Sequence, residues 1–236
     1  MNIVTLLTGR GNNTLKDKNV LPVLGRPLLY YPAIAAKKSK HVTHLYVSSD
    51  DSKILEAAAE IGYRTIVRPK ELALPDSQHV DTIRHAVEIM KNDGIAPDIL
   101  VVVLANNGII KTDWIDECIE MILANATVSA TVPVVEDTDH HPYRAKKLEA
   151  NGFLGTFFNF SGEKISTNRQ DLVKSYFLCH NFWVLNVKES LTDEGQAPWT
   201  FMGDKIKPLV IEESFDVHTM EDIAKTEKWI LENITF

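Results

Sequence analysis

The chain has little cysteine, no excess of positive charge and no long apolar run. It holds two cysteines in 236 residues, Cys118 and Cys179, and carries a formal net charge of −7. Two cysteines build no disulfide framework, and both lie in apolar surroundings, so we expect packed thiols and a cytoplasmic protein. The acidic balance argues against a general nucleic-acid surface. The absence of a membrane-spanning run or an export signal predicts no membrane association.

Two common phosphate-binding motifs are also missing. A Walker loop needs G-x-x-x-x-G-K-[ST] opening directly into a helix, and the chain contains no such string. A dinucleotide fingerprint needs a third glycine where Thr14 follows Gly9 and Gly11. The next favourable helix start lies downstream, with Pro27 suited to a first helical turn. Any phosphate site near the amino end must therefore use a longer loop.

Such a loop is present. An apolar strand at residues 3–7 runs into residues 8–19, which contain two glycines and the cations Arg10, Lys16 and Lys18. Successive backbone N–H groups in loops of this kind form concavities that bind anions. This composition predicts a site for a phosphate chain, hence a nucleotide. The alternative is a surface turn with solvated lysines.

Downstream, apolar strand-like runs alternate with amphipathic helices. This order predicts an α/β fold, a mostly parallel sheet with helices on both faces. We expect strands at 3–7, 45–49, 65–68, 99–104 and 128–135, and helices at 27–38, 52–61, 80–90 and 112–123.

Ligands of such folds bind beyond the carboxyl ends of the strands. Arg68 ends a predicted strand, and the glycine-rich loop, Asp50 and the pair Asn106-Asn107 follow predicted strands. We therefore expect them at one edge of the sheet, although Arg68 could also be a strand-end ion-pair residue.

The pattern changes after residue 135. Residues 140–183 are rich in aromatics and turns, and Asn151-Gly152 is a hairpin signal. We interpret 140–183 as an arm inserted into a single domain of residues 1–236. Its aromatic side chains, Phe153 among them, predict that the arm packs against a second copy in a homodimer. The chain closes with a run at 215–219 and a capping box of Thr219 and Asp222 ahead of a last helix.

Several motifs, taken in order, resemble those of the acylneuraminate (CMP-sialic acid synthetase) cytidylyltransferases. They span almost the whole chain, so together they are more specific than any single one. The matching segments are residues 9–19, 24–29, 47–50, the Arg68-Pro69-Lys70-Glu71-Leu72-Ala73 run, 139–142, Arg169-Gln170 and 215–219.

This resemblance implies a Rossmann-like nucleotidyltransferase fold with a small dimerisation arm. It implies an enzyme that couples CMP from CTP to the anomeric hydroxyl of a 2-keto-3-deoxy sugar acid and releases pyrophosphate. The implied cofactor is Mg²⁺, with Mn²⁺ as an alternative, and the implied partners are CTP, a sugar acid and a second copy of the chain.

The resemblance also implies roles for particular residues. The expected catalytic residues are Arg10, Lys18 and Asp216. Asp216 and His218 are expected at the metal. The nucleotide is expected to contact Gly9, Gly11, Asn12, Asn19, Arg68, Ser77 and His79, with Asn19 fixing the loop or a phosphate oxygen. The sugar acid is expected to contact Asn106, Asn107, His141, Arg169 and Gln170.

The chain departs from the family pattern at several places, one of them Cys179-His180 where an N-G pair is expected. The glycine-rich loop is one residue shorter, and the run that supplies a sugar-binding glutamine reads Ala105-Asn106-Asn107 here. The terminal element has Asp216 and His218 where two aspartates are usual, and imidazole suits Mn²⁺ better than Mg²⁺. These changes leave two alternatives open: a nucleotidyltransferase with another base or acceptor, or a non-catalytic binding protein.

Overall fold

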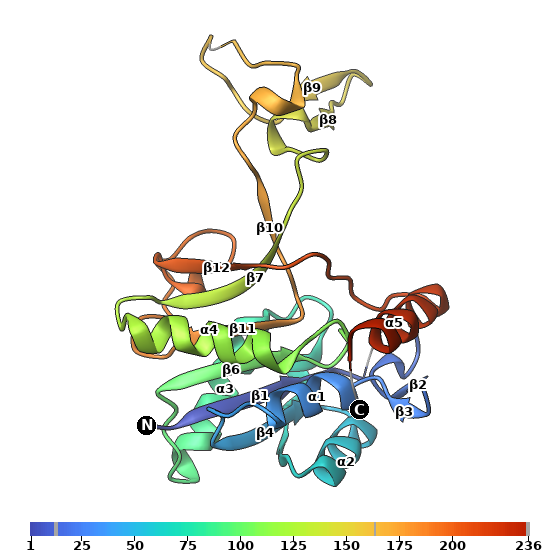
Figure 1. Ribbon diagram of the computed structural model, residues 1–236, viewed down its shortest axis with the longest axis vertical. Helices are drawn as coiled ribbons and strands as arrows, with labels where there is room; N and C mark the ends of the chain where they lie inside the picture. Colours follow the sequence, from blue (N-terminus) through green and yellow to red (C-terminus); the bar gives the residue numbers. More distant parts are fainter. Residues whose placement is uncertain (12–13, 163, 235–236) are drawn as a thin grey trace.

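The computed structural model describes residues 1–11, 14–162 and 164–234 of the chain. The first half carries the predicted alternation of strands and helices (Figure 1). Its elements are β1 (Ile3–Thr8), β2 (Pro22–Val23), β3 (Arg26–Pro27), α1 (Tyr30–Lys37), β4 (His44–Ser49), α2 (Ser52–Ile61), β5 (Arg64–Val67), α3 (His79–Asn92), β6 (Ile99–Leu104) and α4 (Thr112–Ala124). The second half contains β7 (Ala130–Glu136), β8 (Lys146–Leu148), β9 (Leu154–Thr156), β10 (Tyr176–Leu178), β11 (Phe182–Asn186), β12 (Ile206–Val210) and α5 (Met220–Asn233).

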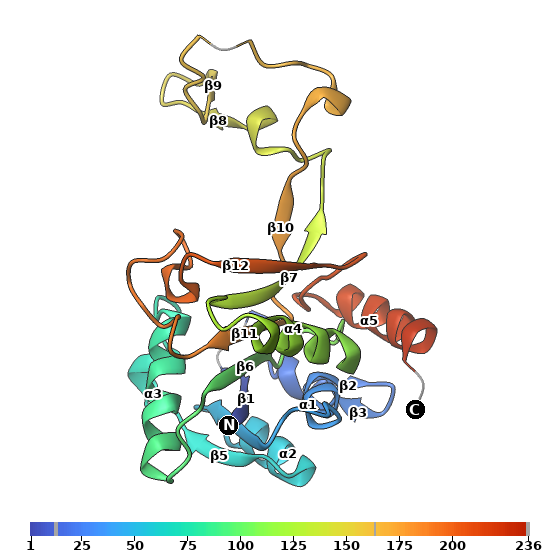
Figure 2. The same ribbon diagram turned by 60° about the vertical axis from the view of Figure 1, so that its left-hand side comes forward.

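Within the described residues, eight strands form one central sheet in the order β10-β7-β11-β6-β1-β4-β5, with β12 beside β7. The pairs β1–β4, β1–β6, β4–β5 and β7–β12 are parallel. Helices cover both faces. Buried side chains of α1, α2 and α4 pack on one face, and those of α3 pack on the other (Figure 2). The α/β fold with helices on both faces is therefore confirmed.

Local sequence located most early elements. The predicted helix at 52–61 is α2, whose first turn is capped by the Asp51 side chain accepting from the Lys53 N–H at 2.8 Å. The predicted start of the first helix at Pro27 is wrong. Pro27 pairs with Pro22 in the short β2–β3 hairpin, and α1 begins at Tyr30. The hairpin closes through Leu24 and Gly25, both at positive φ.

Strand β11 was not predicted, and it changes the end of the arm. It lies between β6 and β7 and runs antiparallel to both. Phe182 and Trp183, included in the predicted arm at 140–183, are buried in this strand at the centre of the sheet. The predicted end of the arm at residue 183 is therefore wrong, because both residues belong to the sheet. The cause is long-range pairing with β6, which leaves no local signal in the sequence.

The arm rises away from the sheet and carries the β8–β9 hairpin at its far end (Figures 1 and 2). The predicted turn at Asn151-Gly152 is present: Gly152 has a φ of 80°, and the Gly152 N–H donates to the Glu149 carbonyl at 2.9 Å. Phe153 and Phe157 are 72% and 60% exposed. The arm thus presents apolar side chains that the chain itself leaves uncovered.

The last helix returns to the amino-terminal half. Thr219 and Asp222 form the predicted capping box at the start of α5. Ile223, Trp229 and Ile230 of α5 pack with Val23 and Ile109 in a third apolar cluster. This packing carries the segment before α5 across the carboxyl edge of β6. Among the described residues, no helix is both long enough and apolar enough to cross a bilayer.

Both cysteines are packed, as predicted. Cys118 and Cys179 are buried free thiols. Burial raises the pKa of Cys118 to about 12 and the pKa of Cys179 to about 11. Both are therefore neutral at physiological pH, in a state with little nucleophilic reactivity.

Candidate active site

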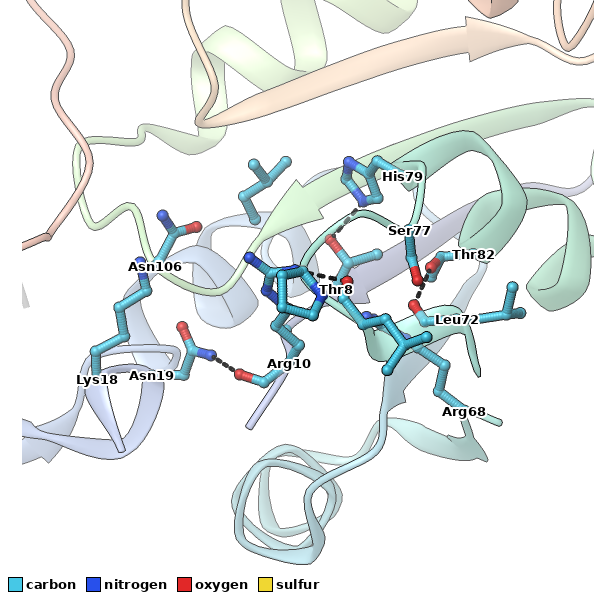
Figure 3. A pocket seen from close by; sticks show the side chains of 14 residues that line it. Thr8, Arg10, Lys18, Asn19, Arg68, Leu72, Ser77, His79, Thr82 and Asn106 are labelled. Carbon is cyan, nitrogen blue, oxygen red and sulfur yellow. Dashed lines mark hydrogen bonds between the residues drawn. The ribbon is translucent and has the colours of Figure 1, made fainter. Parts of the chain in front are cut away.

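A pocket of about 330 Å³ lies beyond the carboxyl ends of β1 and β6, at the predicted edge (Figure 3). Its volume falls within the usual range for small-molecule sites. Lys18, Asn19 and Asn106 stand at one end, and Arg68, Leu72 and Ser77 stand at the other. The complete lining is Thr8, Gly9, Arg10, Lys18, Asn19, Arg68, Leu72, Leu74, Pro75, Ser77, His79, Thr82, Leu104 and Asn106.

Lys18 is a buried cation at this pocket. Its side chain is 9% exposed, and its ammonium donates to the Val217 carbonyl oxygen at 3.1 Å. Burial lowers the pKa of Lys18, while the neighbouring Asp216 carboxylate acts in the opposite direction. An ammonium has three donors, so one bond to a carbonyl leaves capacity for an anion.

Asp216 is brought to Lys18 from near the other end of the chain. The Val217 N–H donates to the Asn106 carbonyl at 3.1 Å, which ties the segment before α5 to the loop after β6. Asp216 Oδ1 accepts from Asn107 Nδ2 at 2.9 Å. Asp216 stands next to the pocket rather than among its lining side chains. The structure thus brings Asp216 to Lys18, and Arg10, the third expected catalytic residue, lines the same pocket as Lys18.

Arg10 and Asn19 hold the glycine-rich loop in place. Arg10 Nη1 donates to the Leu74 carbonyl at 3.0 Å, across the mouth of the pocket. Asn19 Nδ2 donates to the Arg10 carbonyl at 3.1 Å, in agreement with the predicted loop-fixing contact. Asn19 Oδ1 is buried and accepts no hydrogen bond from the described residues. This lone acceptor suits a bound molecule that presents an O–H or N–H donor.

The two glycines of the loop differ in position. Gly9 lines the pocket, and a Cβ there would lie 3.1 Å from Ala105 Cβ. Gly11 instead faces the start of α2: its N–H donates to Asp50 Oδ1 at 3.0 Å, and a Cβ would lie 2.6 Å from Asp51 Oδ2. The structure therefore does not place the Gly11 N–H toward the pocket. Asn12 lies outside the described residues.

Arg68 is anchored at the end of β4. Its Nη2 donates to the Ser48 carbonyl at 2.7 Å, and its Nε donates to Ser48 Oγ at 3.2 Å. Burial lowers the pKa of Arg68 to about 10, opposed by the charge of Asp50. The guanidinium remains charged at neutral pH. With Arg10 and Lys18, it gives this acidic chain a local cluster of three cations, as the predicted phosphate site requires.

His79 and Ser77 form the opposite wall. His79 Nε2 lies 3.1 Å from Thr8 Oγ1, and its ring centroid lies 5.3 Å from that of Trp183. Burial, followed by the charge of Arg68, lowers the pKa of His79 to about 4, so the ring is neutral at neutral pH. Ser77 Oγ donates to the Glu71 carbonyl at 2.6 Å, which fixes the local loop.

Of the residues expected at a sugar acid, Asn106 alone lines the pocket. Asn107 is completely buried, and its amide bonds to Asp216, Ser214 and the Ile109 N–H. Its expected contact with a ligand is therefore corrected to a contact with Asp216.

The other three expected sugar contacts, His141, Arg169 and Gln170, belong to the arm. His141 is buried, and its Nδ1 accepts from the Tyr143 N–H at 3.1 Å. Arg169 Nη1 lies 2.6 Å from Asp139 Oδ1. Because the arm extends away from the sheet, these side chains do not join the pocket of their own chain (Figure 1).

The second expected metal ligand, His218, is exposed at the start of α5, where its backbone N–H donates to Asp222 Oδ2 at 3.0 Å. Across the described residues, no three His, Cys, Asp or Glu side chains are grouped to hold a metal ion. A cation here would therefore need ligands beyond Asp216, such as water or oxygens of a bound molecule.

Sequence reasoning missed several parts of the pocket. The Leu74 carbonyl holds Arg10, and a backbone carbonyl carries no signature in residue type. Thr8 and Leu104 end β1 and β6, so their place at the ends of adjacent predicted strands could have identified them. The bond between Asn107 and Asp216 joins positions 109 residues apart and depends on how α5 packs.

Comparisons of the sequence and of the fold with known proteins both lead to enzymes that use cytidine nucleotides. A sequence model described as cytidylyltransferase matches residues 10–152. The pseudaminic acid cytidylyltransferase of Campylobacter jejuni is 25% identical over 167 residues, 70% of each chain. The CMP-N,N'-diacetyllegionaminic acid synthase of Legionella pneumophila is 23% identical over 233 residues, 97% of this chain and 96% of that protein. Among solved structures, a CMP:2-keto-3-deoxy-manno-octonic acid synthetase complexed with CTP superposes with a TM-score of 0.71 at 13% identity, covering 99% of this chain and 100% of the other.

Proposed function

Because the chain belongs to the cytidylyltransferase family, we propose that it transfers CMP from CTP to the anomeric hydroxyl of a sialic-acid-like 2-keto-3-deoxy sugar acid. A bond forms between the α-phosphorus and the anomeric oxygen, and the bond from the α-phosphorus to the β-phosphate breaks, which releases pyrophosphate. The hydroxyl proton passes to solvent. One observation carries the proposal: the half-buried Asp216 lies near the buried Lys18, which lines a pocket together with Arg10 and Arg68.

This arrangement suits nucleotidyl transfer, which needs positioning and charge neutralisation more than covalent chemistry. Lys18 and Arg10 stand where they could hold the triphosphate. Arg68, Ser77 and His79 form the end assigned to the nucleoside. A neutral His79 bonded to Thr8 gives this end a fixed, uncharged wall.

The donor set fits a magnesium ion that binds together with its nucleotide. Mg²⁺ commonly takes one or two carboxylates and completes its shell with water and substrate phosphates. Asp216 would supply the carboxylate, and the exposed His218 stays a predicted second ligand. When bound, the cation would neutralise negative charge on the triphosphate. Lys18 and Asp216 themselves hold opposite charges side by side before the nucleotide arrives.

The sugar-acid end calls for a second copy of the chain. Asn106 lines the pocket, whereas Arg169 does not and belongs to the arm. The arm rises away from the sheet (Figure 1). In a homodimer joined through the arm, Arg169 would pair with the substrate carboxylate of the partner's pocket, since a guanidinium binds a carboxylate through two parallel bonds. The exposed Phe153 and Phe157 would then be covered.

The direct test incubates the protein with CTP, UTP or ATP, each with Mg²⁺ or Mn²⁺, and with a panel of 2-keto-3-deoxy sugar acids. Pyrophosphate release and formation of a CMP-sugar are measured together. The proposal expects turnover with CTP and at least one sugar acid. Turnover restricted to another nucleotide would contradict the assignment of CTP. Binding of CTP without turnover for any acceptor would instead support a non-catalytic protein.

A further inference from the structure

Asn107 lies in the loop that follows β6 and is completely buried. Its Nδ2 donates to Asp216 Oδ1 at 2.9 Å and to Ser214 Oγ at 3.2 Å. Its Oδ1 accepts from the Ile109 N–H at 2.9 Å. Every polar atom of the amide is therefore bonded, and two of its three contacts lead to the segment that carries Asp216.

These contacts allow the amide only one orientation. If the amide turned over, Oδ1 would face the Asp216 carboxylate and Nδ2 would face the Ile109 N–H. Both new contacts would be repulsive, an acceptor against an acceptor and a donor against a donor. The Ile109 N–H therefore directs the Asn107 donor toward Asp216.

The base of this contact is rigid. Ile109 is completely buried, and its carbonyl accepts from Asn181 Nδ2 at 2.9 Å. Gly108 fits tightly against α5, where an added Cβ would lie 2.7 Å from Thr226 Cγ2. The Asn107 amide is therefore held in place by a rigid loop, and its hydrogen bond can restrain the carboxylate of Asp216, which is only half-buried.

We propose that Asn107 is a positioning residue that holds Oδ1 of Asp216 so that Oδ2 is presented to the divalent cation of the bound nucleotide. The inference rests on the proposed function. A lone carboxylate with no second aspartate beside it can rotate, and a hydrogen bond from a buried amide restricts that rotation. Partners that orient metal ligands in this way typically contribute about 10- to 100-fold in metal affinity.

The test measures Mn²⁺ binding by electron paramagnetic resonance in the presence of an α,β-methylene analogue of CTP. Asn107→Ala is expected to weaken Mn²⁺ binding about 10- to 100-fold relative to the wild type. In the Asp216→Ala background, the same substitution is expected to change Mn²⁺ affinity less than about twofold, because the effect acts through Asp216. Equal losses in both backgrounds would indicate a general structural role and overturn the inference.

Asn186→Ala is the matched control. Asn186 is also a buried amide, and its Nδ2 donates to the Ala126 and Val128 carbonyls at 2.9 and 3.1 Å. It pairs with Ile99, at the end of β6 opposite the loop that carries Asn107. We expect Asn186→Ala to lower thermal stability while leaving Mn²⁺ affinity within about twofold of the wild type. A loss of Mn²⁺ affinity in Asn186→Ala as large as that in Asn107→Ala would overturn the inference.

Should Asn107→Ala fail to fold, as judged by circular dichroism, Asn107→Ser replaces it in the same cycle. Its hydroxyl is too short to reproduce both amide bonds, so dependence on Asp216 is still expected. Additive effects in that cycle would overturn the inference as well.

Steady-state kinetics separates this role from the sugar contact expected from sequence. A positioning role predicts a lower kcat with an unchanged KM for the sugar acid, whereas a sugar contact would raise that KM. Failure of the proposed function looks different. A wild-type protein that releases no pyrophosphate would refute the function, while the Mn²⁺ cycle would still report on Asn107. If Asp216→Ala bound Mn²⁺ as tightly as the wild type does, the inference about Asn107 would be overturned, while CMP transfer itself would not be refuted.

Discussion

The sheet with its helices (the body) and the arm differ in how their polar side chains are hydrogen-bonded and in how their apolar side chains are covered. In the body, Lys18 bonds to Val217 and Asn107 bonds to Asp216, over separations of 199 and 109 residues. In the arm, the polar contacts lie on the surface and join residues closer in sequence, such as His140 with Asp137 and Arg169 with Asp139, which are 3 and 30 residues apart. The body completes its own charged site, whereas the arm leaves Phe153 and Phe157 exposed.

Because of this difference, one part of the proposed reaction would depend on the single chain and the other part on the dimer. The nucleotide end of the pocket is set by long-range contacts within one chain, so it should form before any partner binds. In the proposed homodimer, the sugar-acid end would depend on residues of the arm, which would reach the pocket of a partner chain. Substitutions in the body should therefore affect chemistry directly, and substitutions in the arm should act mainly through assembly.

The largest effect is expected where the two ends of the chain meet. Lys18→Ala and Asp216→Ala should each lower kcat at least about 100-fold. The first removes a preorganised positive charge from the reacting phosphate, and the second removes the carboxylate that would hold the cation there. Pyrophosphate release under saturating CTP is the measurement. Lys18→Arg serves as the control that keeps charge but changes its geometry. Near-normal turnover in either alanine variant would refute the role of that residue.

The next effect tests the arm. The double substitution Phe153→Asp and Phe157→Asp should weaken the homodimer at least about 30-fold, since buried aromatic anchors commonly dominate such contacts. Sedimentation velocity across micromolar concentrations would follow the dimer. Thermal unfolding and CTP binding should remain close to wild type, because neither residue lines the pocket and both flank β9, at the far end of the arm (Figure 1). A wild-type protein that is monomeric at these concentrations would refute the dimer.

Much of the body could be predicted from local sequence, and much of the arm boundary could not. Helix α2 has a cap at Asp51 and an apolar stripe, so its limits were correct. Strand β11 is short and follows a turn-rich region, and its place beside β6 arises from pairing with a strand about 80 residues away. The cations of the glycine-rich loop could be identified because glycines and positive charges that follow a strand indicate an anion site without reference to distant residues. The Asn107–Asp216 bond was missed because it depends on α5 docking.

A third prediction uses His79 in the body. The lowered pKa of His79, about 4, means that the folded protein binds fewer protons than the unfolded chain between about pH 6.5 and pH 4. The stability from neutral His79 is complete above pH 6.5 and is lost as pH falls. We expect a contribution of about 2 kcal/mol to disappear between pH 7.5 and pH 5. Urea unfolding of wild type and His79→Gln measures it, and equal pH dependence in both would contradict the prediction.

The smallest effect is expected for the ion pair between Asp139 and Arg169 in the arm. The two side chains are 67% and 53% exposed, so water screens their charges even at an N···O distance of 2.6 Å. Asp139→Ala should change the free energy of unfolding by less than about 1 kcal/mol in urea titrations. It should also leave Arg169 able to bind the partner's substrate, so the KM for the sugar acid should change little. A loss above about 2 kcal/mol would show that the arm is integrated as tightly as the body, and the contrast between them would fail.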